Sequence, residues 1–504
     1  MRAPFVLSID QGTTGTRAVV YDASGAPAGS AYQEFRQYFP RPGWVEHDPR
    51  EIWAGVLAVT GRALARAKIS SSRLAAIGVT NQRETSILWD KETGKPAGRA
   101  VVWQDRRTAG ACAALKNSGA EKEVRVKTGL VLDPYFSGTK IQWLLKHAPG
   151  LKKRAREGKI LFGTVDSWLL WNLTGGRRHA TDFTNASRTL LLNIKTGLWD
   201  PDLLRLFGVP RAMLPEVMDS GARFGETAAQ GPLVKGIPVL AVLGDQQAAL
   251  YGQGCCREGE VKNTYGTGCF ILLNLGPHFR RPPPGLLATL ACDRDGKKVF
   301  ALEGSIFIAG AAIQWLRDGL KFFRQASRSE AMARSVPDSG GVVVIPALTG
   351  LGAPYWAPLA RGMITGLTRG TRQEHIARAT LESIAQQTAD VLERMESAGV
   401  RKVRELKVDG GATANRFLMQ FQADLLGIPV RVSAVAESTA WGAAKLAGKI
   451  AGIWAEPDTM DRRRKYRLFR PHMSRSAAQA LRAVWKREMA RLLGSGPASA
   501  NRES

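Results

Sequence analysis

The amino-acid sequence predicts an α/β protein made of two large domains that repeat one design. The chain has 504 residues, which is too long for a single hydrophobic core. Short apolar runs typical of strands alternate with stretches of helical periodicity. A pattern of strand, Gly/Thr-rich turn and strand occurs twice, about 250 residues apart, at FVLSIDQGTTGTRAVVYD (5–22) and VKNTYGTGCFILLN (261–274). We infer an internal duplication with a cleft between the halves.

The composition excludes several classes of protein. Hydrophobic residues make up 44% and charged residues 23% of the chain, as in ordinary globular proteins. No apolar run reaches the roughly 18 residues of a transmembrane helix, and the start MRAPFVLSIDQGT lacks the cleavage site of a signal peptide. The five cysteines and six histidines show neither a disulfide framework nor metal-binding spacing. We therefore expect a cytoplasmic protein with no membrane segment.

The net charge of +27 and the pI of about 10.3 would ordinarily suggest a nucleic-acid partner. The basic residues are dispersed, however, with local runs only at 152–156 and 462–467. No zinc finger, basic zipper or RNA-recognition signature accompanies them. We expect a basic surface that helps to attract a nucleotide, and no nucleic-acid partner.

The first hairpin, 5–22, carries residues suited to phosphate and metal. Asp10 closes the first strand, where a carboxylate could hold a metal ion, and Arg17 opens the second, where it could face phosphate oxygens. Thr13, Thr14 and Gly15 give the turn its hydroxyls and its flexibility. An ordinary glycine-rich hairpin would explain the same residues, so this stretch alone leaves both possibilities open.

A helix and a strand follow. Asp48 is suited to cap a helix that begins at Pro49, with apolar residues at helical spacing at Ile52, Val56, Val59 and Ala63. The apolar strand LAAIGVTN (74–81) then ends just before Arg83 and Glu84, at the kind of edge where α/β sheets bind ligands. A surface ion pair would also explain these two residues.

Two aromatic residues occur at predicted strand or turn ends. AVVWQDRR (100–107) predicts a strand that delivers Trp103 and Asp105, and a Pro turn presents Tyr135 before a helix with Ile141, Leu144 and Leu145. Either aromatic could belong to the core or to a pocket.

Another candidate residue, Asp245, lies after a buried strand. GTVDSWLLWNLT (163–174) predicts a strand end and a helix, and 182–200 predicts a loop, a strand and a turn. The strand IPVLAVLG (237–244) then ends at Asp245 and Gln246, where a helix begins. A carboxylate at this place is suited to chemistry, although capping the helix would explain it equally well.

The second half contains the second hairpin, 261–274, followed by strands and helices. A helix begins near Gly310 and Gln314, and 375–399 is amphipathic over its whole length. The strand ending at Asp409 runs into Gly410 and Gly411, which would allow a ligand to approach the backbone or simply form a turn. AESTAWGAAKLAG predicts a helix whose small residues suit tight packing.

Two common nucleotide-binding signatures are missing from the sequence. Neither GxxxxGK[ST] nor GxGxxG after a strand occurs, which excludes a P-loop enzyme and disfavours a dinucleotide fold. Phosphate must therefore be held by the hairpin turns.

Twelve stretches, in order over residues 5 to 450, resemble the motifs of the FGGY family of carbohydrate kinases, and within it those of the glycerol kinases. They are IDQGTTGTRAVVYD, PGWVEHDP, TNQRE, LVLDPYFSGTK, GTVDSWLLW, DFTNASRT, GDQQAAL, KNTYGTGCF, ALEGSIFIAGAAIQWLRD, TGLGAPYWAP, GLTRGT and VDGGATANRFLMQFQAD. The resemblance implies an α/β fold of two actin-like (ribonuclease H-like) ATPase domains, each a mixed β-sheet flanked by helices, around a cleft that binds ATP. The N-terminal domain, 1–250, would carry the first phosphate hairpin and the glycerol site. The C-terminal domain, 251–493, would carry the second hairpin and the adenosine site, and 494–504 would be a disordered tail.

The resemblance also implies roles for individual residues. Asp245 would be the general base, with Asp10 and Arg17 also catalytic, and Asp10 and Asp245 would lie at the Mg²⁺ ion. The glycerol contacts would be Arg83, Glu84, Trp103, Tyr135, Asp245, Gln246 and Phe270. The ATP contacts would be Thr13, Thr14, Gly15, Arg17, Thr267, Gly310, Gln314, Gly411 and Asn415.

The implied activity is ATP-dependent phosphorylation of glycerol to sn-glycerol 3-phosphate by in-line transfer, by a homodimer or homotetramer. Two alternatives stay open at this point. A kinase of another polyol or ketose would share the ATP motifs and differ at Arg83, Glu84, Trp103 and Phe270. A non-catalytic, basic actin-like ATPase that binds nucleic acid or a protein partner would hydrolyse ATP without any polyol.

Overall fold

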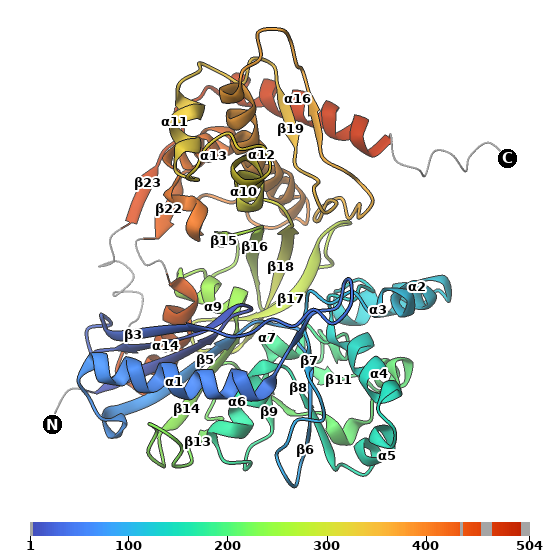
Figure 1. The fold of residues 1–504 in the computed structure, drawn as a ribbon, viewed down its shortest axis with the longest axis vertical. Helices are drawn as coiled ribbons and strands as arrows, with labels where there is room; N and C mark the ends of the chain where they lie inside the picture. Colours follow the sequence, from blue (N-terminus) through green and yellow to red (C-terminus); the bar gives the residue numbers. More distant parts are fainter. Residues whose placement is uncertain (1–3, 434–436, 455–465, 495–504) are drawn as a thin grey trace.

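The computed structural model describes residues 4–433, 437–454 and 466–494. Within these ranges the chain forms two mixed β-sheets, one in the lower half of Figure 1 and one running from its middle into the upper half. The first sheet has the order β13 (Gly225–Glu226), β14 (Pro238–Gly244), β5 (Leu74–Asn81), β1 (Phe5–Gln11), β2 (Gly15–Tyr21) and β3 (Pro27–Glu34). The second has the order β17 (Leu287–Cys292), β18 (Lys298–Ile306), β16 (Cys269–Gly276), β15 (Val261–Tyr265), β21 (Leu406–Asp409), β22 (Val430–Ser433) and β23 (Tyr466–Phe469).

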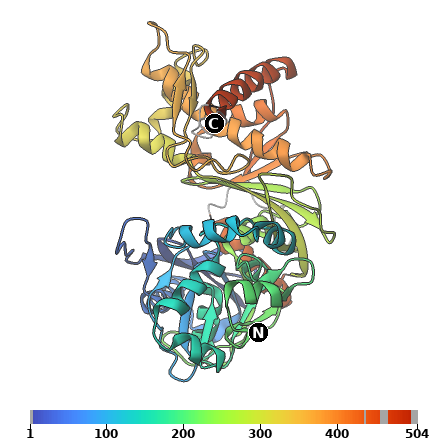
Figure 2. The same cartoon turned by 90° about the vertical axis from the view of Figure 1, so that its right-hand side faces the viewer.

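Helices and short strand pairs surround the two sheets, and Figure 2 shows the N-terminal half below and most of the C-terminal half above. The helices are α1 (Pro49–Ala67), α2 (Ala109–Asn117), α3 (Glu121–Thr128), α4 (Ser137–His147), α5 (Leu151–Arg156), α6 (Val165–Leu173), α7 (Phe183–Ala186), α8 (Pro201–Phe207), α9 (Asp245–Gly252), α10 (Gly310–Asp318), α11 (Arg328–Arg334), α12 (Gln373–Glu396), α13 (Arg416–Leu426), α14 (Ser438–Ile450) and α16 (Arg475–Gly494). The short pairs are β4 (Glu46–His47) with β7 (Ala100–Val101), β6 (Ile87–Asp90) with β8 (Ile160–Gly163), β9 (Ala180–Asp182) with β12 (Glu216–Met218), β10 (Leu192–Asn193) with β11 (Leu198–Trp199), and β19 (Val343–Ile345) with β20 (Met363–Thr365). None of the helices in the described ranges combines the length and the apolar character needed to cross a membrane.

Within the described ranges, the six strands of the first sheet and six of the seven strands of the second share one set of strand directions, and β17 is an additional strand of the second sheet. From β3 through β2, β1, β5 and β14 to β13, successive pairs are antiparallel, antiparallel, parallel, parallel and antiparallel. The same sequence of directions runs from β18 through β16, β15, β21 and β22 to β23. This agreement confirms the internal duplication that the two hairpins predict.

Alternate side chains of a strand point in opposite directions, and the central strand β1 of the first sheet is buried on both faces. Leu7 and Ile9 of β1 belong to a core cluster that includes residues of α1 and α6. Val6 belongs to a second cluster, together with Trp441 of α14. The helix α1 begins as predicted, with the Asp48 carboxylate accepting a hydrogen bond from the Arg50 backbone N–H.

Helix α14 comes late in the sequence but packs on the first sheet and on α9, and Figure 1 shows it among the strands of the lower half. A Cβ atom at Gly442 would collide with the backbone carbonyl of Ala248 in α9, and one at Gly78 of β5 would collide with that of Ala443. The small residues expected to pack tightly therefore do so. Since α9 follows β14 and α14 follows β22, equivalent helices of the two repeats pack against each other.

Two predicted segments differ from the structure. The strand expected at 100–107 ends at Val101, because the chain turns there: the backbone N–H of Asp105 donates to the Val102 carbonyl. The Asp105 side chain holds this turn by accepting hydrogen bonds from the Val45 backbone N–H and from the Arg107 guanidinium. The loop expected after Asp182 is the short helix α7, which that carboxylate caps. The tail 495–504 and the part 462–465 of the basic run lie outside the described residues.

Candidate active site

Three predicted site residues meet at one edge of the first sheet. Strands β1, β5 and β14 run parallel, and their registers pair Asp10 with Thr80 and Thr80 with Leu243. Asp10 therefore lies at the edge where Arg83 follows β5 and Asp245 follows β14. This is the carboxyl edge, where open α/β sheets bind ligands.

Arg83 is a buried hub and not a surface ion pair, since its side chain is only 1% exposed. Its Nη1 donates to Glu303 Oε2 at 2.6 Å and to Gln247 Oε1 at 3.2 Å. Its Nη2 donates to Glu303 Oε1 at 3.2 Å and to the Tyr135 hydroxyl at 3.5 Å. Its Nε lies 3.4 Å from Asp245 Oδ1. Arg83 thus links the predicted base to Glu303, Gln247 and Tyr135.

Two members of this network, Glu303 and Arg188, are absent from the sequence predictions. Arg188 donates from Nε to Glu84 Oε1 at 2.6 Å and from Nη2 to Glu303 Oε1 at 2.9 Å. Burial opposes the charge of Glu303, but the guanidiniums of Arg188 and Arg83 lower its pKa to about 2. Two arginines and two glutamates therefore form a buried, charge-balanced cluster, which we call the arginine–glutamate network (Arg83, Glu84, Arg188 and Glu303).

Glu84 has a backbone conformation that non-glycine residues seldom adopt. Its φ is 61°, and its carbonyl accepts a hydrogen bond from the Ser137 hydroxyl at 2.9 Å. Backbone of this kind costs free energy and persists where surrounding contacts hold it, often at functional sites. Burial raises the pKa of the Glu84 carboxyl, against the guanidiniums of Arg83 and Arg188.

Trp103 and Tyr135 are half-buried and lie together. Their rings meet edge to face with centroids 5.5 Å apart. Trp103 Nε1 donates to the Thr13 hydroxyl at 2.9 Å, so this aromatic pair is connected to the first phosphate hairpin. Tyr135 also packs against the largest core cluster, so both the core and the pocket interpretation of these residues stay predictions.

Asp245 is not used to cap its helix. Gly244 holds the N-cap position of α9. Of the backbone N–H groups of this helix, only that of the adjacent Gln246 donates to the Asp245 carboxylate, at 2.7 Å. Its side chain is 30% exposed. The carboxylate therefore stays accessible at a helix N-terminus, which favours negative charge.

Lys262, another residue that the sequence predictions missed, reaches Gln246 from the second sheet. Its Nζ donates to Gln246 Oε1 at 2.6 Å and to the Thr264 hydroxyl at 2.9 Å. Burial lowers the pKa of Lys262 to about 8, against the carboxylates of Asp409 and Asp245. Lys262 takes up the amide oxygen of Gln246, and the amide nitrogen donates to Asp245 Oδ2 at 3.4 Å, so the second N–H of that nitrogen is the one left to donate to a ligand.

Asp10 has the chemistry of a magnesium ligand. Burial, followed by the carboxylates of Asp245 and Glu437, raises the pKa of Asp10 to about 7, and Arg17 opposes the shift. Arg17 also pairs with Glu437 at 3.0 Å. A cation would relieve this repulsion among carboxylates, and carboxylate oxygens are ligands that Mg²⁺ prefers, so the residues fit the ion. Among the described residues, no three carboxylates, imidazoles or thiols form a complete metal cluster.

The raised pKa of Asp10 predicts a pH-dependent stability of the ligand-free protein. Folded Asp10 binds its proton more tightly than an ordinary aspartate with a pKa of 3.8, so its stabilising contribution is lost as the pH rises through about 7. Asp10→Asn, which stays neutral, should therefore raise the melting temperature at pH 8 by about 2 °C or more, and by less at pH 5. Scanning calorimetry without Mg²⁺ or nucleotide measures this difference. A gain of equal size at both pH values would contradict the assignment.

The predicted nucleotide residues lie in smaller groups. In the second hairpin the Thr267 carbonyl accepts from the backbone N–H groups of Ala309 and Ala311, at the start of α10 beside Gly310. Asn415 caps α13 just after Gly411, and its amide nitrogen donates to the Ser329 hydroxyl at 3.3 Å. A Cβ atom at Gly410 would collide with the Tyr265 carbonyl, which ties this turn to the second hairpin.

Three further predicted residues, Thr14, Gln314 and Phe270, are exposed or half-buried. Thr14 and Gln314 are exposed, and Phe270 is half-buried on β16 opposite Ser305, whose hydroxyl lies 3.5 Å from Glu303 Oε1. A Cβ atom at Gly15, the first residue of β2, would meet the hydroxyl end of the Tyr32 ring, so a larger residue there would have to displace that side chain.

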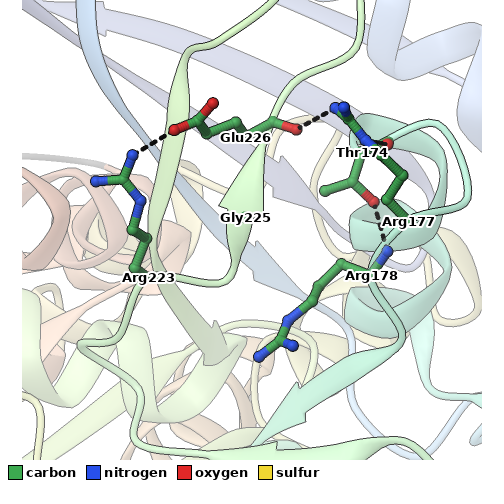
Figure 3. A pocket seen from close by; sticks show the side chains of 6 residues that line it. All are labelled: Thr174, Arg177, Arg178, Arg223, Gly225 and Glu226. Carbon is green, nitrogen blue, oxygen red and sulfur yellow. Dashed lines mark hydrogen bonds and ion pairs between the residues drawn. The ribbon is translucent and has the colours of Figure 1, made fainter.

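A pocket of about 490 Å³ lies elsewhere, and Figure 3 shows it. Its basic side chains are already engaged: Arg223 pairs with the Glu226 carboxylate, and Arg177 donates to the Glu226 carbonyl. None of the predicted site residues lines it; its lining is Thr174, Arg177, Arg178, Arg223, Gly225 and Glu226.

Comparisons with known proteins agree along almost the whole chain. Residues 5–252 match the N-terminal domain and residues 261–451 the C-terminal domain of the FGGY family of carbohydrate kinases. The chain is 55% identical to a glycerol kinase of Trichlorobacter lovleyi over 97% of its length and 99% of the relative's. It is 53% identical to glycerol kinase 2 of Thermotoga maritima, over 97% and 99% of the two chains. The crystal structure of Plasmodium falciparum glycerol kinase with ADP superposes with a TM-score of 0.92 at 35% identity, covering 97% of this chain and 98% of that one.

Proposed function

Because the chain belongs to the FGGY family of carbohydrate kinases, we propose that it transfers the γ-phosphoryl group of ATP to a terminal hydroxyl of glycerol. The products are ADP and sn-glycerol 3-phosphate. The observation that carries the proposal is the accessible Asp245 carboxylate 3.4 Å from Arg83, at the mouth of a buried polar network. Full-length relatives named glycerol kinase support glycerol as the acceptor.

The reaction needs a base and precise positioning more than covalent participation by the protein. Asp245 accepts the proton of the terminal hydroxyl as its oxygen attacks the γ-phosphorus. The bond from that phosphorus to the bridging oxygen breaks, and ADP leaves with the electron pair. The location of Asp245 at the carboxyl edge, with its carboxylate not spent on capping, supports this role.

Selection of a small triol requires several polar partners, because each buried donor or acceptor left unpaired costs about 1–3 kcal/mol. We assign the hydroxyl contacts to Arg83, Glu84, Tyr135 and Gln246. Trp103 and Phe270 pack against the carbon chain.

The phosphates and the metal are assigned to the two hairpins and the residues near them. Asp10, with Asp245 at the same edge, would hold the Mg²⁺ ion of MgATP, which supplies charge neutralisation at the β- and γ-phosphates. The remaining nucleotide contacts are Thr13, Thr14, Gly15, Arg17, Thr267, Gly310, Gln314, Gly411 and Asn415.

A coupled assay of ADP release, with and without glycerol, tests the function. We expect release to depend on glycerol, with one glycerol 3-phosphate formed for each ADP. A panel of other polyols and ketoses serves as the control for the acceptor. ATP hydrolysis at the same rate without any acceptor, or a higher kcat/KM for another panel member, would contradict the proposal.

We place the reaction in the cytoplasm. No disulfide joins any of the five cysteines, all of which lie among the described residues, and this suits a reducing compartment. The dimer or tetramer that the resemblance implies stays a prediction.

A further inference from the structure

Glu303 lies in β18 of the second sheet, but its carboxylate accepts hydrogen bonds from two side chains of the first half, Arg83 and Arg188. It accepts from both terminal nitrogens of Arg83, at 2.6 and 3.2 Å, and from Arg188 at 2.9 Å. All three side chains are at most 1% exposed. A carboxylate that binds a guanidinium at two nitrogens fixes the plane of the guanidinium as well as its position.

The hydrogen-bond donors of Arg83 can be counted one by one. Nη1 is used by Glu303 and Gln247, and Nη2 by Glu303 and Tyr135. Nε, although buried, makes no hydrogen bond within the described part of the chain. It lies 3.4 Å from Asp245 Oδ1 and 3.8 Å from Glu84 Oε1. A buried donor without a hydrogen bond costs folding free energy, so this N–H is suited to donate a hydrogen bond to a ligand oxygen beside the base.

We propose that Glu303 is a positioning residue for the acceptor: by engaging both Nη atoms of Arg83, it leaves Nε–H beside Asp245 as the donor to a glycerol hydroxyl. The inference rests on the proposed function, in which Arg83 contacts glycerol. It adds a carboxylate of the second sheet to an acceptor site whose assigned hydroxyl contacts all belong to the first half, and to which the second sheet otherwise contributes Phe270. The separation of 220 residues between Arg83 and Glu303 makes the contact a link between the two repeats.

A purely structural role is the competing explanation, since removing one partner of a buried ion pair destabilises a protein whether or not the pair touches substrate. The two roles predict different kinetics. Loss of stability alone lowers the amount of folded enzyme and leaves the KM for glycerol unchanged. Misplacement of Arg83 raises that KM while the folded enzyme keeps most of its turnover at saturating glycerol.

The experiment compares Glu303→Gln and Glu303→Asp with the unsubstituted enzyme, measuring melting temperature, kcat and both KM values. We expect Glu303→Gln to raise the KM for glycerol about tenfold or more, with kcat and the KM for ATP within about threefold. Glu303→Asp, which keeps the carboxylate, should restore part of the loss. If Glu303→Gln does not fold, the aspartate variant carries the test, and we expect its KM for glycerol to rise about threefold or more.

Asp390→Asn is the matched control, because it also neutralises a buried carboxylate bound to an arginine, Arg482, at 2.6 Å between α12 and α16. It should lower the melting temperature without changing the KM for glycerol. An unchanged KM in the Glu303 variants, with only the stability loss of Asp390→Asn, would overturn the inference. Failure of the proposed function is distinguishable, because the unsubstituted enzyme would then show no dependence on glycerol.

Discussion

Asp245→Asn is expected to lower kcat by about a hundredfold to ten-thousandfold, which is the usual contribution of a general base. The substitution keeps the size and shape of the side chain and removes its ability to take up a proton. The carboxylate accepts from the Gln246 N–H and is 30% exposed, so an amide can occupy the same place without opening the core. We therefore expect the fold and the melting temperature to change little.

The measurement is ADP release at saturating glycerol and MgATP, with circular dichroism to verify the fold. Asp202→Asn is the matched control, since Asp202 is exposed and pairs with Lys127 on the surface. It should leave kcat unchanged. If Asp245→Asn kept its activity within about tenfold of the unsubstituted enzyme, Asp245 would not be the base and the proton would have to leave by another route.

The sequence predicted the parts of the site whose signals are local. The first hairpin combines a run of apolar residues with a Gly/Thr-rich turn, and the structure forms it, with Asp10 opposite Arg17. Asp245 could be named as a candidate because a carboxylate that directly follows a buried strand and opens a helix is suited to chemistry. Helix α1 could be found because its cap and its apolar periodicity lie within one stretch of sequence.

Glu303, Arg188 and Lys262 were missed because their partners are distant in the sequence. Glu303 lies inside the strand KVFALEGSI, whose other charged residue, Lys298, stands at its start, and Lys262 is the single charged residue of VKNTY; the side chains of Glu303 and Lys262 are both buried. Such a charge must find a partner when it is buried. This signal indicates that a partner exists, but only the structure shows that the partners are Arg83 and Gln246.

The packing partner of α14 can be inferred from the duplication but not from the helical pattern alone. The sequence predicts a helix with small residues but not the surface it meets, because helical periodicity contains no information about the partner. Once the two repeats are recognised, α14 corresponds to α9. The collision that a side chain at Gly442 would make with Ala248 then explains why both helices need small residues at their contact.

Arg83→Ala is expected to raise the KM for glycerol by about a hundredfold or more and to lower stability. Two losses combine: the donor to the acceptor hydroxyl disappears, and Glu303 keeps only Arg188 as its guanidinium partner. Breaking a buried ion pair by removing one partner costs about 3–5 kcal/mol. Because this cost could prevent folding, the alanine variant alone does not identify a substrate contact.

Arg83→Lys separates the two losses. Lysine keeps a positive charge opposite Glu303 but has neither the planar fork nor an Nε–H beside Asp245. The folded enzyme should therefore persist, with a KM for glycerol about tenfold or more above that of the unsubstituted enzyme and an unchanged KM for ATP. Arg106→Lys, at an arginine that is 51% exposed and pairs with Asp133, is the control and should leave both constants unchanged. A normal KM for glycerol in Arg83→Lys would show that the cluster around Arg83 holds the two repeats together without touching the acceptor, and the pocket would then have to be sought nearer Trp103 and Gln246.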